Sequence, residues 1–443
     1  MSYPNDSPQS AALYQRALKS LPGGNTRTTV YIKPFPLYAE RGEGCRIWDV
    51  DGVPRIDCIN NFTAGIHGHG NPAIVDAVSR QLHLGTSFGM PTLSEIALAE
   101  LLCERVASVE RVRFMNSGSE AVMMALKAAR ARTGRSKIAK CEGAYHGSYD
   151  YAEVSLDPSP TEWGKDLPRS VAYARGTPKG VLDDVIVIPF NDPEAATALV
   201  RLHGDELAAI LVDPMPNRAG LVAAEVSFLE TLRALATETG ALLIFDEVIS
   251  FRLGFNGAQA LWGTQADLTC FGKIIGGGFP VGAVGGSVDA MSVFDPTSGK
   301  PALPHGGTFS ANPITMVAGL TSMQLLTAAV FSHLDQLGDQ LRAAINQHFR
   351  AKGIAGGAMG RGSLLKVHFT EREIKDYRSS YAGADAAQKS NRFFRSLLDH
   401  GVLAASYGLM ALSTAMNGAD VEAVADAVGK ALDEVASGRR TAD

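Results

Sequence analysis

The chain has little that would suit a nucleic acid, a membrane or an export route. Its 443 residues carry 41 lysines and arginines against 46 aspartates and glutamates, and the resulting net charge of −5 gives no basic field for nucleic acid or anionic lipid. No apolar run is long enough to span a bilayer, and the polar N-terminus lacks the pattern of a secretory signal. We therefore expect a cytoplasmic protein that binds neither nucleic acids nor membranes.

Cysteine is also scarce, and the number and spacing of the cysteines argue against a disulfide framework and against a metal site. The five cysteines are scattered, odd in number, and without a CxxC or Cys/His spacing that would suit a metal: Cys45, Cys58, Cys103, Cys141 and Cys270. Reduced thiols are the simplest interpretation, and no metal is expected.

What the chain does have is enough apolar sequence, 46% of its residues, for one large core and a smaller one. Residues 1–71 read as an N-terminal arm with a helix at 8–20 and a small antiparallel sheet. Residues 326–443 read as an α+β lobe that packs with the arm.

The central segment, residues 72–325, has a different pattern. Helical periodicity at 73–85 and 94–107 is followed by short apolar runs that alternate with helices. This alternation predicts an α/β domain with a mostly parallel sheet covered on both faces. The apolar runs are at 111–117, 137–143, 184–192, 207–215 and 241–248.

Lys273 lies between an apolar run and a glycine-rich turn, in LTCFGKIIGGGFPVGA. Partial desolvation there would lower the pKa of the amine and free the lone pair that attacks a carbonyl. Asp246 ends the run ALLIFDEV, which is typical of a buried strand that delivers its last residue to a site. Pyridoxal 5′-phosphate (PLP) enzymes use such a pair, the lysine as a Schiff base and the carboxylate on the pyridine nitrogen. Taken singly, the two residues fit a surface lysine and a helix-capping aspartate better.

Two short motifs carry further residues suited to this cofactor. Ser117, Gly118 and Ser119 stand between a strand and a helix start, where free amides and hydroxyls favour a phosphate, although a plain serine N-cap has the same pattern. Tyr145 and His146 follow a short strand between glycines, so that the tyrosine ring suits stacking on a pyridine ring or packing on the sheet edge.

Two more residues belong to the same set. Thr308, in HGGTFSANP, has a hydroxyl suited to an anion or to capping the next helix. Val248, two residues after Asp246, suits either ordinary strand packing or contact with a cofactor ring.

The motifs FMNSGSEA, EGAYHG, LLIFDEV, FGKIIGGGFPVGA and GGTFSANP occur in this order along the chain. Together they resemble the signature set of the class III aminotransferases of fold type I, from about residue 20 to about residue 435. The resemblance implies an α/β fold with a large, mostly parallel sheet and a smaller α+β lobe made of the arm and the C-terminal segment. It also implies a homodimer whose sites are shared across the interface.

The resemblance further implies roles for the matched residues. Lys273 carries the cofactor and moves protons, Asp246 contacts the pyridine nitrogen, and Tyr145 and Val248 cover the two ring faces. The remaining cofactor-binding residues are His146 and, around the phosphate, Ser117, Gly118, Ser119 and Thr308 of the partner subunit.

Arg27, in PGGNTRTTV, is the candidate for binding a substrate carboxylate, because a guanidinium offers two parallel hydrogen bonds; a surface loop arginine is the alternative. In glutamate-1-semialdehyde 2,1-aminomutases and β-amino-acid aminotransferases, an arginine of this segment reaches that carboxylate. The aminomutases usually have NSPVR after PGG and a tryptophan before the GH motif, whereas this chain has NTR and Phe62. The difference favours the β-amino-acid aminotransferases.

Two departures from that family concern substrate selection. Tyr407 stands near the position where some members carry a second arginine for the keto acid. Asn217 and Arg218 stand where relatives have a glutamate and a glycine-containing stretch. We hypothesise that Arg218 recognises a substrate acid group; the alternative is that it pairs with a carboxylate at the domain surface.

Residues 151–182 form a long, proline-dotted stretch without periodicity. A stretch of this kind is either a lid over the site or a disordered insertion, and Trp163 favours a packed lid.

Three functions fit these features. The prediction is an aminotransferase that moves an amino group from an amino acid, with β-amino acids among the candidates, to a keto acid. An aminomutase that moves the group within a semialdehyde is the alternative. A non-catalytic cofactor-binding relative is a third, against which the intact Lys273 and Asp246 argue.

Overall fold

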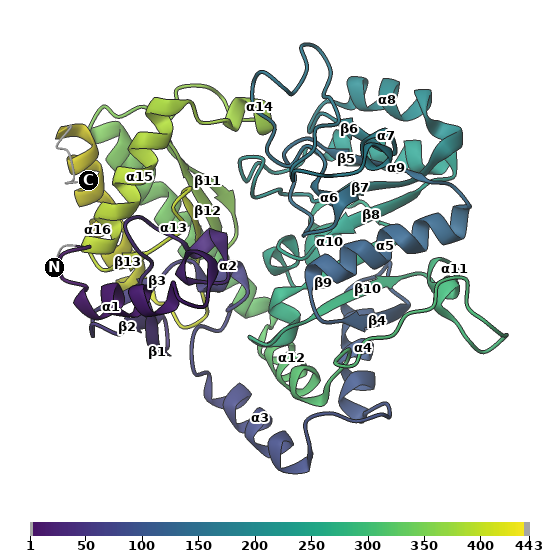
Figure 1. The fold of residues 1–443 in the computed structure, drawn as a ribbon, viewed down its shortest axis with the longest axis horizontal. Helices are drawn as coiled ribbons and strands as arrows, with labels where there is room; N and C mark the ends of the chain where they lie inside the picture. Colours follow the sequence, from purple (N-terminus) through teal and green to yellow (C-terminus); the bar gives the residue numbers. More distant parts are fainter. Residues whose placement is uncertain (1–2, 438–443) are drawn as a thin grey trace.

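The computed structural model describes residues 3–437, which form two lobes (Figure 1). The larger lobe is built on a seven-stranded sheet with the order β4-β10-β9-β8-β7-β5-β6. In chain order these strands are β4 (Arg111–Met115), β5 (Lys137–Cys141), β6 (Val185–Ile188), β7 (Leu207–Val212), β8 (Leu242–Asp246), β9 (Leu268–Gly272) and β10 (Gly282–Gly286).

The pairing from β9 to β6 is parallel throughout, and β10 is antiparallel to both β4 and β9. The mostly parallel sheet is therefore confirmed. Helix α5 (Gly118–Thr133) shares one apolar cluster with Leu211 and Ile244. Helix α9 (Val226–Thr239) shares another with Ile210 and Leu243, so successive strand residues are buried on opposite faces.

Strand β10 was not among the predicted strands, because its sequence GAVGG has the composition of a turn. Its glycines are required by close packing. A Cβ at Gly282 would lie 1.9 Å from the carbonyl oxygen of Ser117, and one at Gly286 would lie 2.6 Å from that of Asp267.

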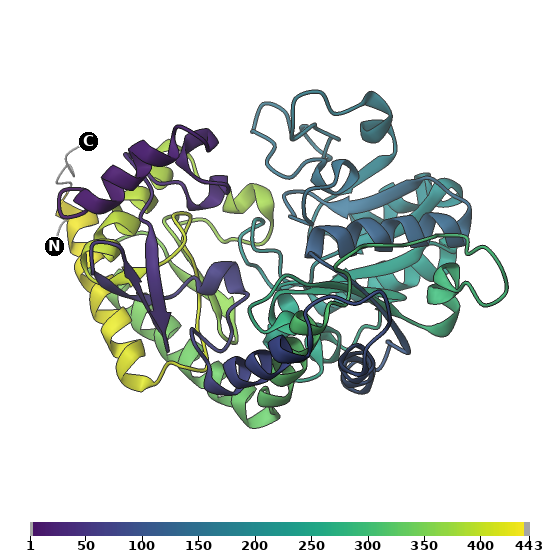
Figure 2. The same cartoon turned by 60° about the horizontal axis from the view of Figure 1, so that its bottom comes forward.

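The smaller lobe joins the two ends of the chain, which Figure 2 shows side by side in purple and yellow. Strands β1 (Ala39–Glu43), β2 (Arg46–Asp49) and β3 (Pro54–Asp57) pair antiparallel, and β13 (Val402–Leu403) adds parallel to β3. The arm and the C-terminal segment thus form one α+β lobe, as expected. We propose boundaries near 71/72 and 325/326.

The remainder of this lobe is a sheet of β11 (Gly357–Arg361), β12 (Leu364–His368) and β14 (Leu409–Ala411), with helices α13 (Ala328–Ala351), α15 (Ala384–Asp399) and α16 (Gly418–Ser437). Helices α1 (Pro8–Ala17), α3 (Pro72–Leu84) and α4 (Leu93–Arg105) lie where the sequence predicts them.

No single helix between residues 3 and 437 is long and apolar enough to cross a membrane. Helices α12 (Pro313–Leu325) and α13 meet that test only as a pair, which bends by 74° at its junction.

Candidate active site

A cavity of about 510 Å³ lies at the carboxyl ends of the parallel strands, where ligands bind in open α/β sheets. It brings together the predicted residues of both lobes. These are Arg27, Phe62, Ser117, Gly118, Ser119, Tyr145, His146, Asn217, Arg218, Asp246, Val248, Lys273 and Tyr407. Thr308 lines a separate cavity.

Lys273 follows β9 directly and has a left-handed backbone conformation, with φ of 51°. This conformation costs about 1–3 kcal/mol for a residue other than glycine, and such strain is typical of functional sites. Burial lowers the pKa of the Lys273 amine to about 8, although the charge of Asp246 opposes this shift, and the nearby Arg252 guanidinium lowers the pKa further. The amine is thereby prepared to react as a nucleophile.

This pKa predicts how the protein without cofactor takes up PLP. Attack on the aldehyde requires the neutral amine, and about one amine in ten is neutral at pH 7, against about one in three thousand at an ordinary lysine pKa of 10.5. The rate of PLP attachment should rise with pH and level off above about pH 8. Stopped-flow absorbance measures it, and a rate that still climbs beyond about pH 10 would refute the shift.

Asp246 is buried at the end of β8, and both of its carboxylate oxygens are held. One accepts a hydrogen bond from the backbone amide of Val248 (3.1 Å), and the other lies 2.7 Å from Nδ1 of the buried His146. Burial lowers the pKa of His146, so we infer a neutral imidazole that donates its Nδ1 proton to Asp246. His146 orients the carboxylate, a role that its sequence motif alone did not indicate.

Asp213 is a cavity residue that the sequence reasoning missed. It directly follows β7, and Asp246 is the last residue of the neighbouring β8, so the neighbouring strand ends were the available signal. Burial, and next the charge of Asp246, raise the pKa of Asp213 to about 8. The raised pKa favours the protonated, neutral form of Asp213 near neutral pH.

The start of α5 offers a cradle for a phosphate. Ser117 is the N-cap, and its hydroxyl accepts a hydrogen bond from the amide of Glu120 (3.1 Å), so the capping interpretation is correct. The cap leaves the first amides of the 16-residue helix free for an anion. A Cβ at Gly118 would lie 2.9 Å from Cγ1 of Val248, which joins the cradle to the ring-binding residues.

These groups together fit PLP. The cavity presents an amine, a buried carboxylate, a helix N-terminus and the ring of Tyr145 in one space. Lys273 would hold the aldehyde carbon, Asp246 the pyridine nitrogen, and Ser117, Gly118 and Ser119 the phosphate. Nε2 of His146 is buried and makes no hydrogen bond within residues 3–437.

Phe62 lies in a turn of unusual conformation. Residues Asn60–Thr63, labelled α2, all have positive φ, of 48°, 49°, 54° and 76°, at a cost of about 1–2 kcal/mol for each residue. Asp57 Oδ1 accepts a hydrogen bond from the amide of Asn60 (2.8 Å), and the buried Arg252 donates to the carbonyl of Thr63 (2.8 Å). These contacts hold Phe62 against the cavity.

Arg27 reaches the cavity beside the same turn. Its Nη1 donates to Oδ1 of Asn61 (2.6 Å), and its guanidinium carbon lies 5.9 Å from the centre of the Phe62 ring. No carboxylate lies within ion-pair distance of Arg27 among the described residues, so its second edge is available to a ligand.

Arg218 pairs with a carboxylate, as one interpretation of its sequence context expects, and its recognition of a substrate acid group stays a prediction. It lines the cavity, and its Nη2 also lies 3.6 Å from a carboxylate oxygen of Asp157. Tyr407 lies beside it, and the tyrosine hydroxyl accepts a hydrogen bond from Nδ2 of Asn217 (3.1 Å). The three predicted residues thus form one end of the cavity.

The stretch 151–182 is packed rather than loose. The ring of Trp163 contacts those of Tyr377 and Tyr381, with centres 6.1 and 5.4 Å away. Arg378 donates to the carbonyl of Trp163 (2.5 Å) and pairs with the buried Glu142 (2.7 Å). The stretch is therefore anchored to α14 (Tyr377–Ser380) of the smaller lobe.

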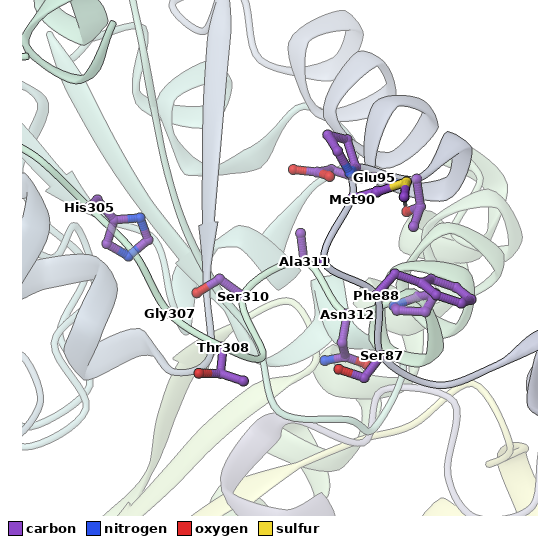
Figure 3. A pocket seen from close by; sticks show the side chains of 14 residues that line it. Ser87, Phe88, Met90, Glu95, His305, Gly307, Thr308, Ser310, Ala311 and Asn312 are labelled. Atoms are coloured by element: carbon purple, nitrogen blue, oxygen red, sulfur yellow. Dashed lines mark hydrogen bonds between the residues drawn. The ribbon is translucent and has the colours of Figure 1, made fainter. Parts of the chain in front are cut away.

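Thr308 lies in a loop beside Gly307 and Ser310 (Figure 3), and the cavity that it lines does not include Lys273, Asp246 or Ser117. Phe88 and Met90 line the same cavity and are exposed. Thr308 and the phosphate-binding residues of the same chain thus line separate cavities, and its contact with a phosphate bound by a partner subunit stays a prediction.

A family model described as aminotransferase class-III matches residues 29–423. The chain belongs to the class-III aminotransferases.

Known relatives of this chain include transaminases and aminomutases. An omega-transaminase from Sphaerobacter thermophilus is 52% identical, with a TM-score of 0.95 and 98% of each chain covered. A β-phenylalanine aminotransferase from Variovorax paradoxus is 36% identical, with a TM-score of 0.86, covering 96% of this chain and 94% of that one. A glutamate-1-semialdehyde 2,1-aminomutase from Methanopyrus kandleri is 39% identical over 440 residues, 98% of this chain and 100% of that protein.

The family confirms the fold type, the cofactor and the reaction class predicted from the motifs. The protein is a PLP-dependent class-III aminotransferase of fold type I. Metal chemistry has no candidate ligand cluster among residues 3–437.

Proposed function

We propose that this aminotransferase takes the amino group of a β-amino acid and passes it to a keto acid. The observation that carries the proposal is the position of Arg27, which Asn61 orients at the same cavity as Lys273. The related β-phenylalanine aminotransferase supports a β-amino donor. We assign the protein to the cytoplasm on its composition.

Four residues that line the cavity have tasks in this proposal. PLP, when bound, supplies an electron sink for the charge that develops as a substrate C–H bond breaks. Lys273 carries the proton between the substrate carbon and the cofactor, which its pKa near neutrality favours. Asp246 would stabilise a protonated pyridine nitrogen, and Tyr145 and Val248 would contact the ring of the cofactor.

Arg27 selects the donor by its carboxylate. A bidentate arginine–carboxylate contact fixes both the distance and the orientation of the donor, and a β-amino acid places its amine one carbon farther from that contact than an α-amino acid does. Phe62 would pack on the carbon skeleton between the two ends.

Replacing Arg27 by alanine tests the donor assignment. We expect kcat/KM for a β-amino acid to fall about 100-fold, because a charged hydrogen-bonded contact is lost, while an amine without a carboxylate is converted as before. Arg16→Ala, on the exposed face of α1, is the matched control. Equal losses for the acid and the simple amine would remove Arg27 from substrate recognition.

An aminomutase remains the second candidate, because a relative of that name is 39% identical over the whole chain. The two functions differ in what they release. An aminotransferase frees a keto product after the first half-reaction and needs a separate keto acid to continue, whereas an aminomutase converts a semialdehyde with no second substrate.

We further propose that a second copy of the chain covers the loop around Thr308 (Figure 3). Phe88, Met90 and Phe309 are 49%, 79% and 59% exposed there, which is unusual for large apolar side chains. Pairing would bury them and bring Thr308 to the phosphate bound by the partner subunit. Sedimentation as a dimer would support this arrangement, and a monomer with full affinity for PLP would contradict it.

A further inference from the structure

The turn that carries Tyr145 and His146 is held by a residue of the smaller lobe. Glu142, the first residue after β5, leads into this turn, and its carboxylate is buried. Nε of Arg378 donates to Oε2 of Glu142 (2.7 Å), and Nη2 donates to Oε1 (3.1 Å). Two parallel bonds of this kind fix the orientation of both partners. Burial raises the pKa of Glu142 and Arg378 opposes that shift, so the guanidinium is what keeps the buried carboxylate ionised.

Tyr377 packs on the next residue of the same turn. A Cβ at Gly143, which has a φ of 73°, would lie 2.1 Å from Cδ2 of Tyr377, so the buried tyrosine ring lies directly on the backbone. The amide of Gly143 also donates to the carbonyl of Ser155 (2.8 Å). The turn is therefore enclosed between α14 and the stretch 151–182.

Arg378 holds that stretch as well. Its Nη2 donates to the carbonyl of Trp163 (2.5 Å), and its guanidinium carbon lies 5.2 Å from the centre of the Trp163 ring. Its Nη1 donates to the carbonyls of Gly164 (3.2 Å) and Lys165 (3.4 Å). One planar guanidinium thus bridges a carboxylate of the larger lobe and three consecutive carbonyls, which a lysine ammonium could not do.

Both segments held by Arg378 line the cofactor cavity. The turn supplies Tyr145 and His146, and the stretch 151–182 supplies Leu156 and Tyr173. Arg378 itself lies outside the lining of this cavity. Its influence on the cofactor therefore has to pass through these two segments.

We propose that Arg378 is a positioning residue for the cofactor. Its ion pair with Glu142 fixes the turn that places Tyr145 and His146 at the PLP ring. Its bonds to the carbonyls of residues 163–165 hold the neighbouring stretch against the same turn. This assignment concerns the cofactor half of the site and does not depend on which amino acid the enzyme accepts.

Replacing Arg378 by glutamine tests the route through Glu142, which then stays buried without its bidentate partner. We expect the holoenzyme to release PLP about threefold to tenfold faster, measured as the loss of yellow absorbance after dilution. The circular dichroism of the yellow band should weaken, because Tyr145 is no longer held in one orientation. Arg350→Gln, in the last turn of α13 and exposed, is the matched control.

Replacing Arg378 by lysine separates the two contacts. Lysine keeps a positive charge beside Glu142, but its ammonium cannot also span the carbonyls of residues 163–165. Trypsin should therefore cut the holoenzyme after the exposed Lys165 at least about tenfold faster in both Arg378 variants. PLP release from Arg378→Lys should nevertheless stay within about twofold of normal. Mass spectrometry of timed digests identifies the cleavage site.

Glu142→Gln approaches the same ion pair from the other side. It remains informative if Arg378→Gln does not fold, because the arginine that it leaves behind is partly exposed and can be solvated. Its PLP release should also accelerate, and combining it with Arg378→Gln should accelerate release no further. Normal PLP release and an unaltered yellow band in either folded glutamine variant would overturn the proposal. Equally fast release from Arg378→Lys and Arg378→Gln would overturn the route through Glu142.

Discussion

Replacing Lys273 by alanine is expected to lower kcat by about 10⁴-fold or more, because the same amine both holds the cofactor and moves the substrate proton. The yellow absorbance of the lysine-bound cofactor should disappear with it. The variant keeps the cradle at the start of α5, Asp246, Tyr145 and Val248. It should therefore still bind PLP without a covalent bond. Absorbance spectra before and after gel filtration, together with single-turnover kinetics, measure both effects.

Lys300→Ala is the matched control, because Lys300 is exposed in a loop of the same lobe. Its spectrum and kcat should equal those of the unaltered enzyme. Turnover by Lys273→Ala at more than about a hundredth of the normal rate would mean that another group moves the proton, and the mechanism would be wrong.

Replacing Asp246 by asparagine is expected to lower kcat about 10²-fold to 10³-fold. Asparagine keeps the size of the side chain and a contact with His146, but it carries no charge to stabilise a protonated pyridine nitrogen. The loss should therefore fall on the C–H bond-breaking step, seen as a slow half-reaction with a deuterium isotope effect, rather than on donor binding.

Asp213 provides an unusually close control for this experiment. It lies in the same cavity, but burial raises its pKa and favours its neutral acid form, for which asparagine is a near match in charge and shape. Asp213→Asn should change kcat less than about threefold at neutral pH. Equal losses in Asp213→Asn and Asp246→Asn would show that the charge of Asp246 has no special role.

The cofactor half of the site could be predicted from the sequence because its residues occur at fixed positions in local motifs. Lys273 directly follows a strand, Asp246 ends one, and Ser117 begins a helix, so each position is set by one strand or helix. The parallel sheet then brings these ends together at one edge. The order of the motifs supplied the specificity that no single residue had.

Features that depend on contacts distant in sequence could not be predicted. The left-handed turn Asn60–Thr63 is held partly by Arg252, far along the chain, and only its two asparagines hinted at it. The sequence of β10 has the composition of a turn, and its glycines are explained only by close packing such as that of Ser117 against Gly282. The pairing of β3 with β13 likewise joins segments that are remote in sequence.

The substrate half was predicted only as a set of candidates. Arg27, Phe62, Asn217, Arg218 and Tyr407 all line the cavity, but their roles remain proposals. The ion pair of Asp157 with Arg218 had no motif to mark it, because the two residues are far apart in the sequence. A pairing of this kind is visible only once the stretch that carries Asp157 is packed against α14.

The most direct test of amino-group transfer is a half-reaction on the purified yellow enzyme. Mixed with a β-amino acid alone, the enzyme should lose its absorbance and release one equivalent of keto product, and a keto acid added afterwards should restore the colour. A response only to a semialdehyde or diamino acid, with no dependence on a keto acid, would contradict this account and establish the aminomutase reaction.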